Sequence, residues 1–206
     1  MFIAITREVS SSINQCELTN LEREPIDYER ACEQHAQYES ALKHLGVAVL
    51  SLPEEPTLAD SVFLEDTALV LDECAIITRP GADSRRPETE SIAKVLAPYR
   101  RLFFIEAPAR VDGGDILRIG KKIYVGISTR SDTNAIEQMQ DFLAPFGIDK
   151  QSIFCNLRDR RFEMQASRHG HGVDFITEWR EKILHLLDGI CVAASRDTDI
   201  NLFTNS

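Results

Sequence analysis

The sequence predicts an α/β fold in which one module, a strand hairpin followed by a helix and a further strand, is repeated along the chain. Short apolar runs typical of buried strands alternate with longer segments whose apolar residues recur at helical spacing. This order recurs at intervals of about forty residues, as in other repeat architectures. The motif "DGGDIL" does not match the Gly-rich phosphate loop of a dinucleotide-binding sheet. The 206 residues suffice for one domain with a substantial core.

The first cycle begins with a buried strand, "FIAITR", at residues 2–7. Asp27 is the expected N-cap of a helix that continues through Leu45, and Gly46 is the expected stop. A strand at 47–52 follows. The helix is expected to face the core with one stripe, in which the histidine is a core side chain: Tyr28, Ala31, Cys32, His35, Tyr38, Leu42 and Leu45.

The second cycle opens with a hairpin over residues 67–78, whose tight turn is "DE" at 72–73. Pro87 is expected in the first turn of a helix, because proline needs no backbone partner there. This helix continues to about Leu96, and a strand follows at 101–106.

The third cycle comprises a hairpin at 114–127 and a helix from about 132 to 146. After residue 155 the pattern becomes irregular and arginine-rich, before an apolar stretch at 175–194 that is expected to form a helix and then a strand. We therefore divide the chain into residues 1–155, which hold the repeated modules, and residues 156–206, an atypical C-terminal segment of the same domain.

The chain is acidic, with a formal net charge of −10 at pH 7 and a pI near 5.0. This charge argues against binding to nucleic-acid phosphates and is compatible with a cationic small-molecule substrate, or simply with solubility. No segment has the pattern of a membrane span or a signal peptide. The cysteines form no C-x-x-C pair, which is typical of reduced thiols in a cytoplasmic protein; they are Cys16, Cys32, Cys74, Cys155 and Cys191.

Charged side chains gather at the boundaries of the predicted strands. Carboxylates occur in "LADSVFLEDTALV" and "RVDGGDIL", and arginines in "GADSRRPE" and "GISTRSD". A guanidinium ion presents planar pairs of N–H groups that match carboxylates, and nearby arginines could hold the carboxylate of an amino-acid ligand. The pattern predicts a site for such a cation, made from Asp60, Glu65, Asp66, Asp112, Asp115, Arg85, Arg86 and Arg130.

Several of these residues also have a purely structural interpretation. Asp60 alone could be a solvated loop residue, and for Asp115 we favour hydrogen bonds to amides of its own turn. The glycine pair 113–114 permits either a positive φ or a close approach of the backbone to a ligand. His169 and His171 have no companion ligand, so no metal site is expected there.

The runs "DSVFLEDTALVLDECAIITRPGADSRRPETE" and "DGGDILRIGKKIYVGISTR" resemble the dimethylarginine dimethylaminohydrolases, within the guanidine-modifying pentein superfamily. The resemblance extends over residues 1–150, approximately. It implies a pentein-type α/β propeller of ββαβ-like modules, of which about three of five are recognisable here, in agreement with the repeat. Residues 1–155 would then be a partial pentein domain.

The resemblance also implies an activity, which is hydrolysis of Nω-methylated arginine to citrulline and a methylamine without a metal or other cofactor. In that reaction a cysteine thiolate attacks the guanidinium carbon, a histidine transfers protons, and carboxylates hold the guanidinium nitrogens. By position, Asp112 is implied as the catalytic carboxylate. The implied substrate-binding residues are Leu18 in a mobile loop, Asp60, Glu65 and Asp66 in the guanidinium pocket, and Arg85 and Arg130 at the substrate carboxylate.

The resemblance ends where the family has its histidine and cysteine. At the place of the family's Leu-His-Leu-Lys strand this chain has "RDRRFEMQAS" (158–167), and it contains no Gly-Gly-x-x-Cys turn. His185, Cys155 and Cys191 lack the surroundings of the catalytic pair. We therefore expect little or no turnover, and we hypothesise a disrupted reading frame or an aberrant terminus.

Two other functions stay open at this point. A catalytically inactive remnant would bind a guanidine or a protein partner, and arginine analogues would stabilise it without turnover. An arginine or agmatine deiminase would share the fold but act on unmethylated guanidines. In either case an incomplete propeller leaves apolar strand edges unpaired, which favours a homo-oligomer.

Overall fold

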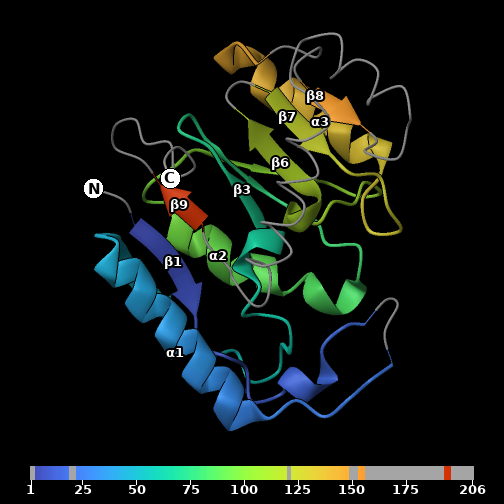
Figure 1. Ribbon diagram of the computed structural model, residues 1–206. Helices are drawn as coiled ribbons and strands as arrows, with labels where there is room; N and C mark the ends of the chain where they lie inside the picture. Colours follow the sequence, from blue (N-terminus) through green and yellow to red (C-terminus); the bar gives the residue numbers. More distant parts are fainter. Residues whose placement is uncertain (1–2, 19–21, 120–121, 149–152, 156–192, 196–206) are drawn as a thin grey trace, which may run out of the picture.

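Three small sheets with the same topology make up the computed structural model (Figure 1). The structure describes residues 3–18, 22–119, 122–148, 153–155 and 193–195. In each of these sheets the middle strand pairs antiparallel with one neighbour and parallel with the other. A helix connects the two strands of each parallel pair. The α/β class and the repeat that the sequence predicts are therefore confirmed.

The first sheet has the strand order β2–β1–β9. β1 (Ile3–Arg7) runs parallel to β2 (Ala48–Leu52), and α1 (Tyr28–His44) connects them. β9 (Ala193–Ser195) pairs antiparallel with β1. The C-terminal segment thus contributes the strand that a hairpin supplies in the other two sheets. β9 lies at the end of the apolar stretch at 175–194, where a strand is expected, and the helix expected before it lies outside the described residues.

The second sheet has the order β3–β4–β5. β3 (Ala68–Val70) and β4 (Ala75–Ile77) form the predicted hairpin, and β5 (Leu102–Phe104) runs parallel to β4. α2 (Glu88–Leu96) connects β4 to β5. Ile76 is the middle residue of the register and has partners on both neighbouring strands.

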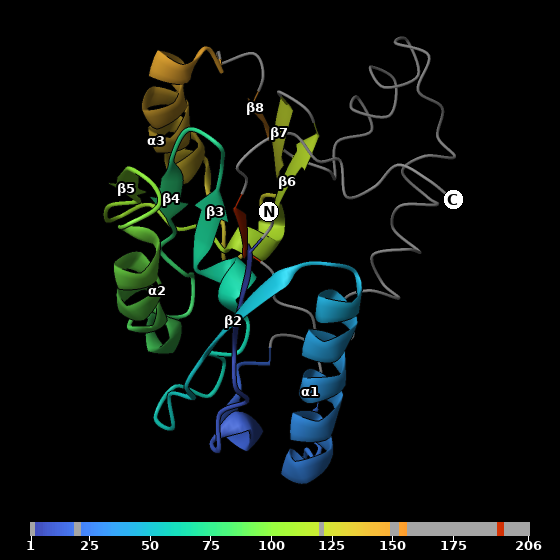
Figure 2. The ribbon, with the colours of Figure 1, turned by 90° about the vertical axis from the view of Figure 1, so that its left-hand side faces the viewer.

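The third sheet has the order β6–β7–β8. β6 (Ile116–Ile119) and β7 (Lys122–Val125) form a hairpin, and β8 (Ile153–Cys155) runs parallel to β7. α3 (Thr133–Leu143) connects β7 to β8. Figure 2 shows α1 on one side of the strands and α2 and α3 on the other.

Short 3-10 turns connect the regular elements, and two of them occupy equivalent positions in successive modules. The turn η2 ends one residue before β3 begins, and η4 comes directly before β6. Within the described ranges the turns are η1 (Ile13–Gln15), η2 (Leu64–Asp66), η3 (Asp83–Arg85), η4 (Gly113–Asp115) and η5 (Ala144–Phe146).

The helix ends follow from local side-chain chemistry. The Asp27 carboxylate accepts a hydrogen bond from the Arg30 amide at 3.1 Å, which satisfies one of the free N–H groups at the start of α1. Asp132 does the same for the Ala135 amide at the start of α3. Gly46 follows α1 with a φ of 82°, a conformation that a side chain would strain. These ends agree with the predicted helix to within one residue at α1.

The predicted helix 132–146 is divided in the structure. α3 ends at Leu143, and the last three residues form the tighter turn η5. Pro145 explains this division, because proline cannot donate the backbone hydrogen bond that would continue an α-helix.

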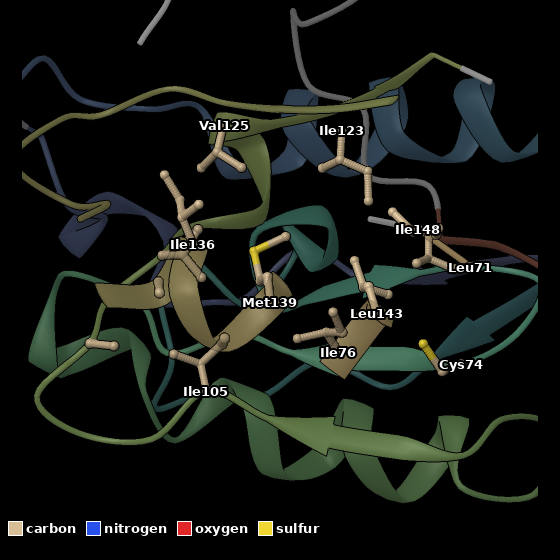
Figure 3. Packing of buried hydrophobic residues seen from close by; sticks show 13 residues of the cluster. Leu71, Cys74, Ile76, Ile105, Ile123, Val125, Ile136, Met139, Leu143 and Ile148 are labelled. Atoms are coloured by element: carbon tan, nitrogen blue, oxygen red, sulfur yellow. The ribbon is translucent and has the colours of Figure 1, made fainter. Parts of the chain in front are cut away.

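The largest buried cluster lies between the second and third sheets and beneath α3 (Figure 3). Ile136, Met139 and Leu143 lie on one face of α3, are at most 5% exposed, and belong to the same buried cluster as the strand residues Ile76 and Ile123. A second cluster joins β1, the hairpin β3–β4 and α2. Together the two clusters fix both hairpins, and the site described below lies at the ends of these hairpins.

α1 is less buried than the sequence predicts. His35, Tyr38 and Leu42 of the predicted stripe are half-buried, but Tyr28 is 38% and Leu45 75% exposed. No residue of α1 is fully buried as a whole, but the His35 side chain is only 9% exposed, so this histidine faces inward as the sequence predicts; its Nε2 lies 3.4 Å from the Glu39 carboxylate. No helix among the described residues has the length and apolarity needed to cross a membrane.

Candidate functional site

The candidate site forms where corresponding ends of two hairpins meet. Asp66 ends the turn η2 before β3, and Gly113 begins the turn η4 before β6. Val111 forms an isolated antiparallel β-bridge with Arg79, which follows β4. The Val111 N–H donates to the Arg79 carbonyl at 2.9 Å. The Thr78 hydroxyl donates to the Asp66 carbonyl at 2.6 Å. These contacts bring the two acidic turns together although they are far apart in the sequence.

The two glycines of "DGGD" are required for this approach. An ideal Cβ on Gly113 would lie 1.9 Å from the carbonyl oxygen of Glu65. A Cβ on Gly114 would lie 2.6 Å from Asp66 Oδ1, which instead accepts a hydrogen bond from the Gly114 amide at 2.9 Å. Neither glycine has a positive φ. Of the two explanations that the sequence allowed, the structure selects close approach, and the neighbour is this chain's own acidic turn.

Arg85 is a buried cation at the centre of the acidic turn η2. Its Nη1 lies 2.5 Å from Asp66 Oδ2, and its Nε and Nη2 donate to the Glu88 carboxylate at 2.9–3.3 Å. Its Nη2 also donates to the carbonyls of Asp60 and Phe63. The side chain is only 3% exposed. The expected contact of Arg85 with a substrate carboxylate stays a prediction. In the structure, the ion pairs of Arg85 are with the protein's own carboxylates.

Asp112 is buried at 1% exposure and contacts two loops. Its Oδ1 accepts a hydrogen bond from the Gly81 amide at 2.9 Å, and its Oδ2 lies 3.3 Å from Arg130 Nε. A Cβ on Gly81 would lie 2.5 Å from the Cα of Arg130, so these two loops also require a glycine where they touch. The Arg130 side chain is 43% exposed, which leaves part of its guanidinium accessible to a ligand.

Asp115 has the structural role that we favour for it, but with different partners. Its Oδ2 accepts hydrogen bonds from the hydroxyls of Ser128 at 2.9 Å and Ser131 at 2.5 Å. Ser131 Oγ in turn accepts from the Asp112 amide at 3.1 Å. Asp115 therefore holds the 128–131 loop, and Arg130 with it, in place beside Asp112.

Asp60 connects the site to the segment that contains Leu18. Asp60 Oδ2 accepts a hydrogen bond from the Glu17 amide at 3.0 Å, and the neighbouring Leu18 is exposed. Arg86, in contrast, turns away to pair with the exposed Asp83. The implied residues Asp60, Glu65, Asp66, Asp112, Arg85 and Arg130 are thus adjacent in space, with Leu18 at the margin.

Burial raises the pKa of three carboxyl groups of this site, those of Asp60, Glu65 and Asp112. Burial raises the pKa of Asp60 and of Asp112, although hydrogen bonds from backbone amides oppose the rise. Burial also raises the pKa of Glu65 to about 8, with the Asp66 charge acting in the same direction. Burial alone would lower the pKa of Arg85, but the carboxylates of Asp66 and Glu88 outweigh it and raise this pKa.

Three residues of the site, Glu88, Gly81 and Ser131, are not among those that the sequence predicts. Glu88 lies three residues after Arg85, a spacing that brings two side chains together on a helix, and this was the available signal. Gly81 and Ser131 contact Asp112 only because their loops fold against it, so no local sequence pattern indicated them. Among the described residues no group of three His, Cys, Asp or Glu side chains is arranged to hold a metal ion.

The positions discussed for a catalytic histidine and cysteine fall largely outside the described residues. His169, His171, His185 and Cys191 are in this part of the chain, and Cys155 lies in β8 without a described side chain. Cys74 is buried, and burial raises the pKa of its thiol to about 11, which makes it a poor nucleophile.

Comparison with known proteins assigns a family to this arrangement. The model of the eukaryotic N,N dimethylarginine dimethylhydrolase family matches residues 4–147. The dimethylarginine dimethylaminohydrolase of Pseudomonas aeruginosa is 42% identical over 124 residues, which are 59% of this chain and 49% of the relative. That of Streptomyces coelicolor is 36% identical over 145 residues, 70% of this chain and 56% of the relative. The chain spans about half the length of these curated relatives.

Solved structures agree with the sequence relatives. A mutant of the Pseudomonas aeruginosa enzyme complexed with citrulline superposes with a TM-score of 0.71 and 36% identity, covering 77% of this chain and 61% of that one. The N-terminal domain of ArgZ, an arginine dihydrolase from cyanobacteria, superposes with a TM-score of 0.64 at 18% identity and so shows the fold alone; it covers 78% of this chain and 59% of its own. The described modules have the pentein fold, and the chain belongs to the dimethylarginine dimethylaminohydrolase family.

Proposed function

We propose that the described residues form the guanidinium-binding part of a dimethylarginine dimethylaminohydrolase site. The observation that carries this proposal is the gathering of acidic side chains whose ionised forms have too little compensating charge. Asp60, Glu65 and Asp112 all have a raised pKa because they are buried. A cation that enters between them would favour their ionised forms and would be bound in return.

A guanidinium fits this site better than a compact ammonium ion. Its planar N–H groups donate to several carboxylates at once, and the carboxylates here approach from both acidic turns, η2 and η4. The relatives' own name, dimethylarginine dimethylaminohydrolase, points to a methylated arginine as the ligand. Arg130, whose guanidinium is partly accessible, is the proposed partner of the ligand's carboxylate.

Each implied residue then has a proposed role. Asp60, Glu65 and Asp66 hold the guanidinium nitrogens, and Asp112 is the acidic group next to the reacting carbon. Fixed carboxylates of this kind orient the carbon for attack, which makes the reaction effectively intramolecular. Arg85 keeps Asp66 in place, and the exposed Leu18 lies at the margin of the site.

We further propose that this chain binds the guanidinium ligand but turns it over slowly or not at all. In the family a cysteine supplies the nucleophile and a histidine the proton transfer, and neither has its motif in residues 156–206. Reduced turnover, a cytoplasmic location and a homo-oligomer stay predictions, as does the disrupted reading frame.

Calorimetric titration of the purified chain tests the binding proposal. NG,NG-dimethyl-L-arginine should bind and raise the unfolding temperature, whereas L-norleucine, which has the carboxylate but no guanidinium, should not. Asp66→Asn should weaken binding by about tenfold, or about 1.4 kcal/mol. The exposed Glu90→Gln carries the same change of charge and should bind like the wild type. If dimethylarginine neither binds nor stabilises, the proposal is wrong.

Measurement of product separates the remaining alternatives. Citrulline release from dimethylarginine at rates ordinary for an enzyme would contradict the expected loss of turnover. Faster release of citrulline from arginine, or of N-carbamoylputrescine from agmatine, than of citrulline from dimethylarginine would indicate a deiminase. Binding without release from any of the three would identify a guanidine-binding remnant.

A further inference from the structure

Glu88 is a buried carboxylate directly behind the candidate site. It is the first residue of α2 and only 2% exposed. Its carboxylate receives Arg85 Nε at 3.2 and 3.3 Å and Arg85 Nη2 at 2.9 Å. Glu88 therefore occupies one side of the Arg85 guanidinium with both of its oxygen atoms.

Asp66 occupies the remaining nitrogen of the same guanidinium. Arg85 Nη1 lies 2.5 Å from Asp66 Oδ2, while Asp66 Oδ1 accepts from the Gly114 amide. A chain of charged contacts thus runs from Glu88 through Arg85 and Asp66 to the turn η4. The protein's own guanidinium already uses the carboxylate that a guanidinium ligand needs.

We propose that Glu88 is a positioning residue for this site: it holds Arg85 from behind, so that Asp66 can exchange its bond with Arg85 for a bond with the ligand. The inference rests on the proposed binding of a guanidinium. A buried ion pair is costly to break when one partner is left without a counter-charge. Because Glu88 remains paired with Arg85, the Arg85 cation keeps a partner when Asp66 turns to the ligand.

Charged groups of η2, of the loop before it and of β1 interact with Glu88, in addition to Arg85. Asp60 and Asp66 lie before and within η2, and Glu65 is close enough to feel the Glu88 charge. Arg7 of β1 also interacts electrostatically with the Glu88 carboxylate. Its guanidinium donates to the hydroxyl of Ser91, which in turn donates to the Glu88 carbonyl at 3.1 Å.

These surroundings place the titration of Glu88 in the neutral range. Burial raises the pKa of Glu88 to about 7, Arg85 opposes the rise, and Asp60 and Asp66 add to it. A protonated Glu88 cannot balance Arg85. We therefore expect the affinity for a guanidinium to fall as the pH decreases from 8 to 6, in part because Glu88 loses its charge.

Two substitutions separate charge from shape. Glu88→Gln keeps the size of the side chain and removes its charge, whereas Glu88→Asp keeps the charge and shortens the side chain by one methylene. Glu90→Gln, on the exposed face of the same helix, is the matched control. Thermal unfolding of each variant establishes that it is folded before binding is measured.

Titration with NG,NG-dimethyl-L-arginine at pH 8 and pH 6 gives the first result. Glu88→Gln should raise the Kd by about tenfold at pH 8, which corresponds to about 1.4 kcal/mol, and by much less at pH 6. Glu88→Asp should retain the dependence on pH, and the control should match the wild type. A Glu88→Gln variant that binds like the wild type, or that loses the same factor at both pH values, overturns the proposal.

A second measurement needs no ligand and is informative even if the proposed function fails. The Arg85 Nε–H signal in nitrogen-15 NMR, assigned by its loss in Arg85→Lys, should exchange slowly with water in the wild type. In Glu88→Gln it should shift and exchange faster, and in Glu90→Gln it should not change. An unchanged Arg85 signal in Glu88→Gln overturns the positioning role. A changed signal in a chain that does not bind dimethylarginine supports that role and shows that the ligand class is wrong.

Discussion

Gly113 lies against the backbone carbonyl of Glu65, so close that a Cβ at this glycine would be 1.9 Å from the oxygen. The contact joins two turns that occupy equivalent positions before β3 and β6. It also brings the Asp66 carboxylate within 2.9 Å of the Gly114 amide. The acidic site therefore depends on the absence of a side chain at positions such as 113.

Gly113→Ala should destabilise the protein, because the methyl group cannot be accommodated unless one of the two turns moves. We expect a loss of about 2–4 kcal/mol in the free energy of unfolding, in the range of other strained or overpacked sites. Urea denaturation measures it. Gly126→Ala is the control, because a Cβ there meets no atom nearer than 3.7 Å and should cost less than about 1 kcal/mol. Equal losses in the two variants would show that the close contact is not the cause.

Glu65→Gln should stabilise the protein at alkaline pH and have little effect at acid pH. The pKa of Glu65 is about 8 in the folded chain and near its usual 4.5 when unfolded, so the folded state binds this proton more tightly. Stability is consequently greatest below about pH 4.5 for this group and falls as the pH rises toward 8. Glutamine removes that loss.

Thermal unfolding at pH 5 and pH 8.5 tests this sign. We expect the free energy of unfolding of Glu65→Gln to exceed that of the wild type by roughly 1–3 kcal/mol at pH 8.5, and the two values to be similar at pH 5. The stability of the exposed control variant Glu90→Gln should depend on pH in the same way as that of the wild type. A greater advantage at pH 5 than at pH 8.5 would contradict the direction of the Glu65 shift.

Arg130→Ala should discriminate between ligands that have a carboxylate and those that do not. Arg130 is the half-exposed arginine next to Asp112, so its loss should raise the Kd of dimethylarginine by about tenfold and that of agmatine by less than about threefold. Arg110→Ala is a suitable control, since its side chain is similarly exposed at 42% and its Nε lies 3.6 Å from Asp132. An equal loss of affinity for the two ligands would show that Arg130 does not bind the ligand's carboxylate.

Asp115→Ala should destabilise the loop that carries Arg130. The substitution leaves the hydroxyls of Ser128 and Ser131 without their acceptor, and we expect a loss of about 1–3 kcal/mol. Asp83→Ala removes an exposed ion pair with Arg86 and should cost less than about 1 kcal/mol. Urea denaturation compares the two variants, and an Asp115→Ala variant as stable as Asp83→Ala would contradict the structural role of Asp115.

Much of the fold could be predicted because the signals are local. The hairpin turn at 72–73, the cap at Asp27 and the stop at Gly46 are each specified by a few neighbouring residues. The burial of α1 could not be predicted in this way. An apolar stripe indicates which face of a helix turns inward, but how deeply Tyr28 and Leu45 are covered depends on what packs against them.

The acidic residues of the candidate site were likewise visible in the sequence, since Asp60, Glu65, Asp66 and Asp112 stand out at strand boundaries. Their partners were not. Whether Arg85 contacts Asp66, and why residue 113 must be glycine, depends on which loops come together when the chain folds. Periodicity and turn chemistry act over a few residues, whereas a buried ion pair or a steric contact joins positions tens of residues apart. For that reason local patterns were sufficient for the modules and the acidic turns, and only the packed structure determined how the charges are paired.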